Sequence, residues 1–270
     1  MTAYIDLHNH ILHAIDDGPG TLKESVLLAR AMVEAGYSTV VTTPHVVEGR
    51  PELSVIEERI NELQAELNRQ QISLSLLPGA EHHIDPQILE RLQDGTALTL
   101  NNSRYLLLEL PFFQPLPPYT EQLIFNLKTH GYCPIIPHPE RAVALQKDYA
   151  LIHRLHQAGA LYQVTWGAIT GRLGPLPEKV AHHIVKVKLA HLFATDAHNF
   201  AGRLMDLQNA TATLEYLLGP GTAEPYLTDL PRAVINNEEF KFPPAAEYGA
   251  PTDKTPSESP FKRLFTRKRS

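Results

Sequence analysis

Two histidines and two adjacent aspartates near the start of the chain could together bind a metal ion. His8 and His10 are separated by one residue in a run with strand character, and Asp16 and Asp17 follow, just before Gly18. Because side chains alternate along a strand, both imidazoles would face one side, where they can bind one cation. The aspartates and the glycine suit a turn that brings an oxygen ligand over this site. A histidine pair alone is weak evidence, since such residues also serve packing or capping.

More side chains of this kind follow short apolar runs along the chain. A buried parallel strand has such a continuous apolar sequence. The runs that predict strands are 4–10, 38–43, 73–78, 105–110, 133–137, 161–165 and 192–195. Six of the seven end in imidazoles or carboxylates: His8 and His10, His45, Glu81, Glu109, His138, and Asp196 with His198. Without a cation, such groups crowded together would repel one another or lack partners.

Helical patterns separate the predicted strands. Thr21 with Glu24, and Ser54 with Glu57, have the spacing of a capping box at a helix start. Residues 204–218 and 228–238 also have helical patterns and would cap the body. Strands that alternate with helices predict a parallel sheet, and seven such units predict a closed or nearly closed barrel. We therefore expect one α/β domain whose polar residues meet at the carboxyl ends of the strands, where such barrels have their active sites.

The predicted ligands contain nitrogen and oxygen donors and no sulfur. With Asp17 they number nine, which exceeds the need of one ion and predicts a cluster of two or three bridged by Glu81. The donor set suits Mn, Fe or Zn, and such a cluster activates water near neutral pH and polarises an anionic substrate. Arg141 and Arg203 fall in the same rim loops, where a guanidinium can hold a phosphoryl group through two hydrogen bonds. His198 could assist the departure of the leaving group.

Composition argues against several classes of protein and of site. Of the 270 residues, 1–261 contain 19 basic and 30 acidic side chains, a net charge of −11, which argues against nucleic acid as the main partner. The one cysteine, Cys133, excludes an intrachain disulfide and thiolate metal clusters. It is also not a phosphatase nucleophile, because Pro139 stands where such a thiolate would require an arginine. No apolar run approaches the ~18 residues of a membrane span, and the N-terminus lacks a secretory pattern, so we expect a cytoplasmic protein.

The last part of the chain differs from the rest. We expect the barrel to occupy residues 1–242, because from Pro243 the sequence is rich in Pro, Ser, Thr and charged residues. Such a composition predicts a disordered, solvated tail. Residues 262–270 hold five basic and no acidic side chains beside Phe261. An alternative is therefore a weak membrane contact, at ~1 kcal/mol per basic residue near anionic lipid.

Taken in order, the motifs resemble the polymerase and histidinol phosphatase (PHP) superfamily. Within it they resemble the bacterial manganese-dependent protein-tyrosine phosphatases of capsule and exopolysaccharide clusters. The resemblance covers about residues 4–240 and depends on the whole combination of motifs. The motifs are Asp6-Leu7-His8-Asn9-His10, Ile15-Asp16-Asp17-Gly18, Thr43-Pro44-His45, Gly79-Ala80-Glu81, Leu108-Glu109-Leu110-Pro111, His138-Pro139-Glu140-Arg141 and Thr195-Asp196-Ala197-His198-Asn199.

The resemblance implies a distorted (β/α)7 barrel with three metal ions. It implies one ion held by His8, His10, Glu81 and Asp196, a second by Glu81, Glu109 and His138, and a third by Asp17, His45 and His198. Arg141 and Arg203 match the arginines that hold the phosphate. The implied substrate is the phosphotyrosine tail of a membrane tyrosine autokinase that controls polysaccharide synthesis. His13 and Trp166 depart from the family pattern and flank the cleft, so this departure concerns the substrate preference rather than the metal site.

Three other hypotheses remain open. The chain could be a histidinol-phosphate phosphatase or a nuclease of the same superfamily, although its acidic body disfavours the nuclease. It could instead be a catalytically silent module that binds and regulates the kinase tail. A barrel amidohydrolase would share the first histidine pair but usually needs a histidine at the sixth strand, where this chain has Trp166. The native metal, the phosphoprotein substrate and the oligomeric state do not follow from the sequence.

Overall fold

Parallel strands in two sheets form the centre of the molecule. The computed structural model describes residues 3–200 and 207–239. Within them, one sheet has the order β1 (Tyr4–Asn9), β2 (Tyr37–Thr42), β4 (Ser75–Leu77). The other has the order β3 (His45–Val46), β5 (Glu81–His83), β6 (Tyr105–Glu109), β7 (Cys133–Pro137), β8 (Leu161–Thr165), β9 (Leu192–Ala194). Every strand pair in these sheets is parallel, as predicted.

The two short strands β3 and β5 continue β2 and β4 beyond a bend. The chain bends at Thr43-Pro44 in one case and at Pro78-Gly79-Ala80 in the other. A Cβ atom added to Gly79 would lie 2.7 Å from a methyl carbon of Val41, so this close approach requires glycine. The seven predicted strands are therefore present, and the breaks in the second and third of them are an addition that the sequence analysis did not predict.

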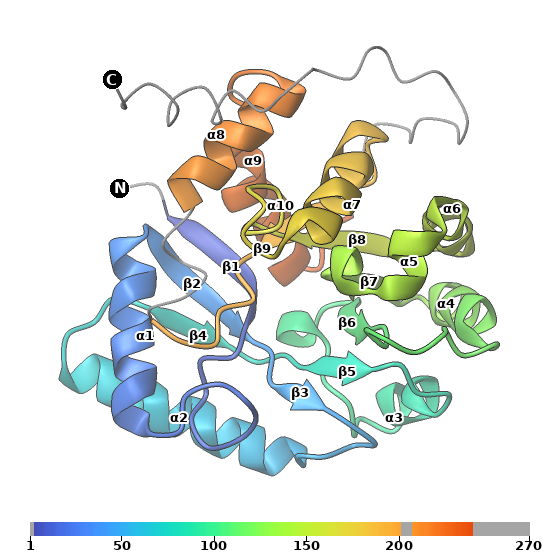
Figure 1. Ribbon diagram of the computed structural model, residues 1–270. Coiled ribbons are helices and arrows are strands. Elements are labelled where there is room, and N and C mark those ends of the chain that lie inside the picture. The colour runs from blue at the N-terminus through green and yellow to red at the C-terminus, as the bar shows by residue number, and fades with distance from the viewer. Residues whose placement is uncertain (1–2, 201–206, 240–270) are drawn as a thin grey trace, which may run out of the picture.

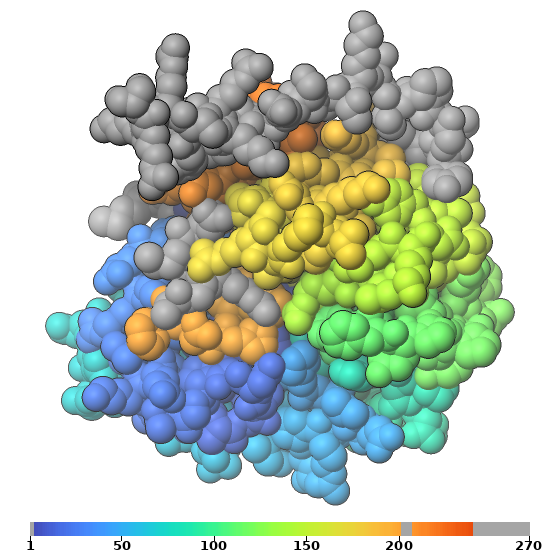
Figure 2. Space-filling view, in the orientation of Figure 1, coloured from blue at the N-terminus to red at the C-terminus, as the bar shows by residue number. Residues whose placement is uncertain are grey.

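The first and last strands meet and close the barrel. The backbone N–H of Asp196 donates to the carbonyl of His8 at 3.0 Å, and the N–H of His10 donates to Ala197 at 3.0 Å. Figure 2 shows the orange residues that follow β9 against the blue N-terminal part of the chain. The carboxylate of Asp6 reinforces this seam, because it accepts from Thr195 N at 3.0 Å and Thr195 Oγ1 at 2.5 Å. The predicted closed or nearly closed barrel is thus confirmed.

Helices surround the strands (Figure 1). They are α1 (Leu22–Glu34), α2 (Leu53–Arg69), α3 (Ile88–Gln93), α4 (Thr120–Thr129), α5 (Val143–Lys147), α6 (Tyr149–Ala158), α7 (Pro175–Lys186), α8 (Leu207–Leu218), α9 (Glu224–Leu227) and α10 (Asp229–Ile235). The capping box of Thr21 and Glu24 is confirmed at the start of α1. The one predicted at Ser54 is wrong, because α2 begins at Leu53 and no side chain caps it.

Two apolar clusters pack the two faces of the strands. The larger lies between the strands and the outer helices and includes Val40, Leu106 and Ile136. The smaller contains Ile5, Leu7, Val41, Leu100, Tyr105, Leu107, Ile135, Leu192 and Val234. Because these residues come from strands all around the barrel, they fill its interior. Val234 belongs to α10, which therefore closes the amino-terminal end of the barrel and leaves the carboxyl end for polar groups.

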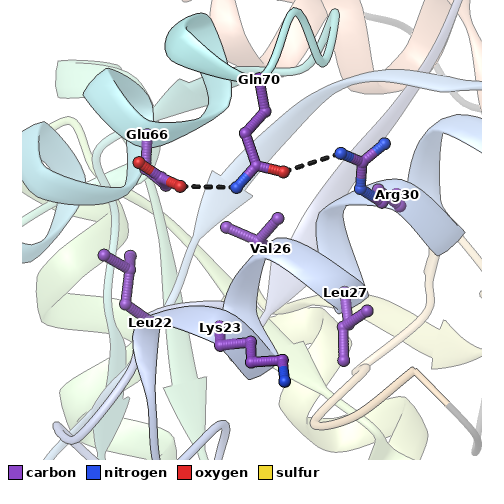
Figure 3. A pocket seen from close by; sticks show the side chains of 7 residues that line it. All are labelled: Leu22, Lys23, Val26, Leu27, Arg30, Glu66 and Gln70. Carbon is purple, nitrogen blue, oxygen red and sulfur yellow. Dashed lines mark hydrogen bonds between the residues drawn. The ribbon is translucent and has the colours of Figure 1, made fainter.

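A hollow on the outer surface lies between α1 and α2 (Figure 3). Gln70 accepts a hydrogen bond from Arg30 at 2.7 Å and donates one to Glu66 at 2.5 Å. The other lining residues are Leu22, Lys23, Val26 and Leu27. Its lining contains none of the predicted metal ligands, so it is separate from the chemistry that the sequence indicates.

Some sequence predictions fall outside the described residues. These are Arg203 and the tail of residues 243–270, so the role of the arginine and the disorder of the tail stay predictions. Among the helices that the structure describes, none combines the length and the apolar character that crossing a bilayer requires.

We predict that the seam at Asp6 contributes strongly to stability. Replacing Asp6 with alanine would leave the buried N–H and hydroxyl of Thr195 and the amide of Asn9 without their acceptor. We expect a loss of about 3 kcal/mol in the free energy of unfolding, measured with urea in the presence of a chelator. Asp6→Asn keeps one acceptor oxygen and should lose less. An alanine variant as stable as wild type would contradict this account of barrel closure.

Candidate metal centre

The carboxyl ends of the strands bring all nine predicted ligands to one place. His8 is the last residue but one of β1, Glu109 ends β6, His138 follows β7 directly, and Asp196 follows β9 after Thr195. The broken strands supply His45 at the start of β3 and Glu81 at the start of β5, because each bend returns the chain to the barrel. His10, Asp17 and His198 complete the set from adjoining loops.

Glu81 lies at the centre of the group. Its side chain is fully buried, and four imidazoles surround it. Its Oε2 lies 3.2 Å from His8 Nε2, 3.3 Å from His10 Nε2 and 3.0 Å from His45 Nδ1. Its Oε1 lies 2.7 Å from His138 Nε2. This one carboxylate therefore contacts four imidazoles from three different parts of the chain.

Two further buried carboxylates flank Glu81. Asp196 Oδ1 lies 3.6 Å from the Nε2 atoms of both His8 and His10. Glu109 Oε1 lies 3.7 Å from His138 Nε2, and its Oε2 lies 3.7 Å from His45 Nδ1. The donors of the first two implied metal sites thus lie side by side, with Glu81 common to both.

The third implied site opens toward solvent. Asp17 Oδ1 lies 3.2 Å from His198 Nε2 and 3.5 Å from His45 Nε2. The side chain of Asp17 is 66% exposed, whereas that of His198 is 15% exposed. His45 links this site to Glu81 through its other nitrogen. A ligand from solvent would therefore meet this side of the cluster first.

The donor arrangement fits divalent cations. Two ligand atoms about 2.1 Å from one ion are roughly 3 Å apart, which matches the spacing here. Glu81 Oε2 and His45 Nδ1 are buried and make no well-directed hydrogen bond, although their neighbours are close. The Nε2 atoms of His8 and His10 are only 3.1 Å apart and can share one proton at most. Three groups of donors lie within 4.8 Å of one another: His10, Asp17, His45, His198; His8, His10, Glu81; and His45, Glu81, Glu109.

The electrostatics of the cluster strongly favour positive charge. Burial alone would raise the pKa of Glu81, but the imidazoles of His8 and His138 hold it well below its ordinary value. Burial alone would lower the pKa of His10, but its hydrogen bond with Asp16 and its contact with Glu81 raise it to about 10. A cation must therefore displace protons from the imidazoles when it binds.

Two polar residues outside the cluster orient its histidines. Asp16 Oδ2 lies 2.7 Å from His10 Nδ1, and Gln163 Oε1 lies 2.9 Å from His8 Nδ1. Each acceptor holds the proton on Nδ1, so that Nε2 presents its lone pair to the centre. The sequence analysis assigned Asp16 only to a turn and missed Gln163. The available signal was a single amide within the apolar strand β8, where it is buried.

Backbone strain accompanies two of the predicted ligands. His138 has φ of 34° and Asp196 has φ of 51°, both in the left-handed region. A residue with a side chain loses roughly 1–2 kcal/mol in this conformation, and such residues concentrate at functional sites. The turn at each strand end directs the side chain inward over the barrel mouth.

Arg141 approaches the cluster from the short helix Pro139–Arg141. Its Nη1 donates to Asp196 Oδ2 at 3.2 Å, and its guanidinium carbon lies 4.2 Å from the centre of the Phe112 ring. The side chain is 29% exposed, so part of it faces solvent. It therefore presents positive charge at the edge of the metal centre.

Comparisons with known proteins agree with this geometry. The profile of the family "Capsular polysaccharide synthesis, CpsB/CapC" matches residues 4–236. The chain belongs to this family. It is 36% identical over 244 residues to the tyrosine-protein phosphatase YwqE of Bacillus subtilis, across 89% of this chain and 95% of that protein. The family predicted from the motifs is therefore confirmed.

Solved structures show the same fold. One comes from work on YwqE of Bacillus subtilis and CpsB of Streptococcus pneumoniae, described as unique metal-dependent tyrosine phosphatases. It has a TM-score of 0.85 and 34% identity, and covers 90% of this chain and 99% of its own. A mutant organophosphorus hydrolase from Deinococcus radiodurans, at 13% identity, has a TM-score of 0.52 and covers 87% of this chain and 92% of its own. It shares the fold only. The predicted distorted barrel is confirmed.

One more histidine in this CpsB/CapC member touches the cluster. His83 Nε2 lies 2.7 Å from Glu109 Oε2, and its side chain is 47% exposed. It follows Glu81 by two residues on β5, so strand alternation could have identified it. The sequence analysis did not, because it took only Glu81 from the end of that strand.

We predict that Gln163 supports metal affinity. Gln163→Leu keeps the bulk of the side chain but removes the acceptor for His8 Nδ1, so we expect the cation affinity to fall about 10- to 100-fold. Isothermal titration of the metal-free protein with Mn²⁺ measures this. Gln163→Glu keeps the acceptor and is the matched control. Equal affinities for wild type and the leucine variant would show that Gln163 does not orient the ligand.

Proposed function

We propose that this chain is a metal-dependent protein-tyrosine phosphatase, a phosphoric monoester hydrolase. One observation carries the proposal: the convergence of nine ligand residues with nitrogen and oxygen donors, with the buried carboxylate of Glu81 at their centre and Arg141 at their edge. Membership in the CpsB/CapC family supports phosphotyrosine as the substrate, because the relatives it matches are named tyrosine-protein phosphatases.

The proposed ligands divide among two or three ions. His8, His10, Glu81 and Asp196 would hold one, Glu81, Glu109 and His138 a second, and Asp17, His45 and His198 a third. When bound, the cations supply a water of lowered pKa as nucleophile and polarise the phosphoryl group. Manganese is the proposed native metal, and Fe, Co and Zn fit the same donor chemistry.

The side chains of the rim would position and neutralise the phosphate. Arg141 would turn its guanidinium from Asp196 to the phosphoryl oxygens, whose charge it stabilises through two hydrogen bonds. Arg203 would contribute in the same way. The leaving phenolate has a free pKa of ~10, so it needs less help than an alkoxide, and His198 could supply a proton.

The proposed cellular setting follows from the family. We propose that the substrate is the tyrosine-phosphorylated tail of a membrane autokinase that regulates capsular or exopolysaccharide synthesis, and that the enzyme acts in the cytoplasm. Residues 262–270, with five basic side chains, would add a weak contact with anionic lipid. Deletion of residues 245–270 with a liposome-binding assay tests this contact, and unchanged binding would exclude it.

We predict that Glu81→Gln abolishes phosphatase activity. The change removes the central negative charge while it keeps the shape, so turnover of p-nitrophenyl phosphate with Mn²⁺ should fall by at least ~100-fold. His138→Ala should fall comparably. Glu121→Gln, at an exposed glutamate on α4, is the control and should keep wild-type turnover. Wild-type activity in Glu81→Gln would refute the proposed centre.

Substrate competition tests the specific activity. The Mn²⁺-loaded protein should hydrolyse a phosphotyrosine peptide with a higher kcat/KM than histidinol phosphate, and should leave single-stranded DNA intact. Parallel metal analysis and assays with Mn²⁺, Co²⁺, Zn²⁺ and a chelator identify the active metal. Preference for histidinol phosphate would replace the proposed function with the first alternative, and tight peptide binding without turnover would replace it with the regulatory module.

A further inference from the structure

The segment between β6 and α4 (Figure 1) carries an aromatic ring that lies against the metal centre. Phe112 follows Glu109 by three residues. The centre of its ring lies 5.2 Å from that of His138, with the two planes at 62°. The Arg141 guanidinium covers one face of the same ring at 4.2 Å. Phe112 therefore contacts both a proposed metal ligand and the proposed phosphate-binding side chain.

The next residue extends this aromatic surface into solvent. Phe113 is 80% exposed, and its ring centre lies 6.3 Å from that of Phe112 at 79°. A single exposed phenylalanine is common on protein surfaces and carries no meaning alone. Phe125, which is 51% exposed on α4, is such a case. Phe113 differs because it continues a chain of ring contacts that begins at the metal centre.

The backbone of this segment is held before any substrate arrives. Val143 N donates to the carbonyl of Phe112 at 2.8 Å, which ties the segment to the helix that follows Arg141. Pro111 and Pro115 flank the two phenylalanines and restrict the backbone. A preformed surface costs less ordering on binding than a flexible one, so each contact contributes more to affinity.

The chemistry of the substrate determines what would cover this surface. In an aryl phosphate, the ring begins one ester oxygen from the phosphorus. When Arg141 holds the phosphoryl group, the ring must therefore leave the centre near Phe112, which Arg141 already contacts. An edge-to-face contact of two rings is worth about 0.5–1.5 kcal/mol beyond the area it buries. An alkyl phosphate has no ring and gains nothing here.

We propose that Phe113 is a specificity-determining residue that, with Phe112 behind it, packs against the phenyl ring of phosphotyrosine and selects aryl over alkyl phosphate esters. This inference rests on the proposed function, since it concerns the substrate of the same centre. The metal cluster binds the phosphoryl group common to all phosphate monoesters, and Phe113 distinguishes what is attached to it.

Phe113→Ala tests the proposal in the full-length protein loaded with Mn²⁺. We expect KM for a phosphotyrosine peptide to rise about five- to tenfold, the loss expected for one aromatic contact. The kcat, the KM for β-glycerophosphate and the inhibition by inorganic phosphate should all stay near wild type. Phe113→Trp should restore the low KM, and Phe125→Ala is the matched control for removal of an exposed phenylalanine.

A binding measurement separates this proposal from the proposed function. A fluorescent peptide with a non-hydrolysable phosphonate analogue of phosphotyrosine should bind Phe113→Ala more weakly than wild type by the same factor, as measured by anisotropy. If wild type hydrolyses phosphotyrosine but the variant keeps its KM and peptide affinity, the proposal fails and the function stands. If wild type neither hydrolyses nor binds the phosphotyrosine probes, both fail.

Discussion

One buried carboxylate constrains the rest of the structure. Glu81 has no exposure to solvent, and an isolated charge in such a place would cost several kcal/mol. Imidazoles from β1, the loop after it, β3 and the end of β7 compensate this charge, so the strands that carry them must end at the same level. The ring nitrogens of these imidazoles point toward one another, so a positive charge between them, such as a bound cation, is needed to stabilise the arrangement. Cation binding and folding are therefore coupled in this protein, because the folded state contains the site and the unfolded chain does not.

The two ends of the barrel have different roles. At the amino-terminal end, Val234 of α10 and Leu100 close an apolar interior. At the carboxyl end, His138 and Asp196 adopt left-handed backbone conformations that lower stability. The seam at Asp6 lies between these ends and fixes Thr195, the neighbour of the strained Asp196. The apolar end and the seam thus supply the stability that offsets the backbone strain at the polar end.

Much of this arrangement could be predicted because a parallel barrel converts sequence order into spatial proximity. A residue at the end of each apolar run reaches the same rim, so His45, Glu109 and His138 could be grouped without coordinates. The orientation of individual side chains was harder to predict. Ile5 and Leu7 face the interior, and strict alternation would turn His8 toward the helices, but an irregularity in the pairing of β1 between Asp6 and Asn9 returns it inward. Such a bulge leaves no mark in the sequence pattern. The amide of Gln163 stands out within an apolar strand, but its role depends on a contact with His8, 155 residues away.

Selection among phosphate esters requires more than the cluster of donors around Glu81. Under the proposed function, the donors around Glu81 would bind a phosphoryl group through charge, and charge does not distinguish a phenyl ester from an alkyl ester. Discrimination must therefore come from residues beyond the cluster, and only segments that leave the strand ends can supply it. The segment after Glu109 would do so with two aromatic rings, one against His138 and one in solvent. Substrate preference on a shared fold thus depends on the loops that follow the strand ends, where chains of one fold are free to differ.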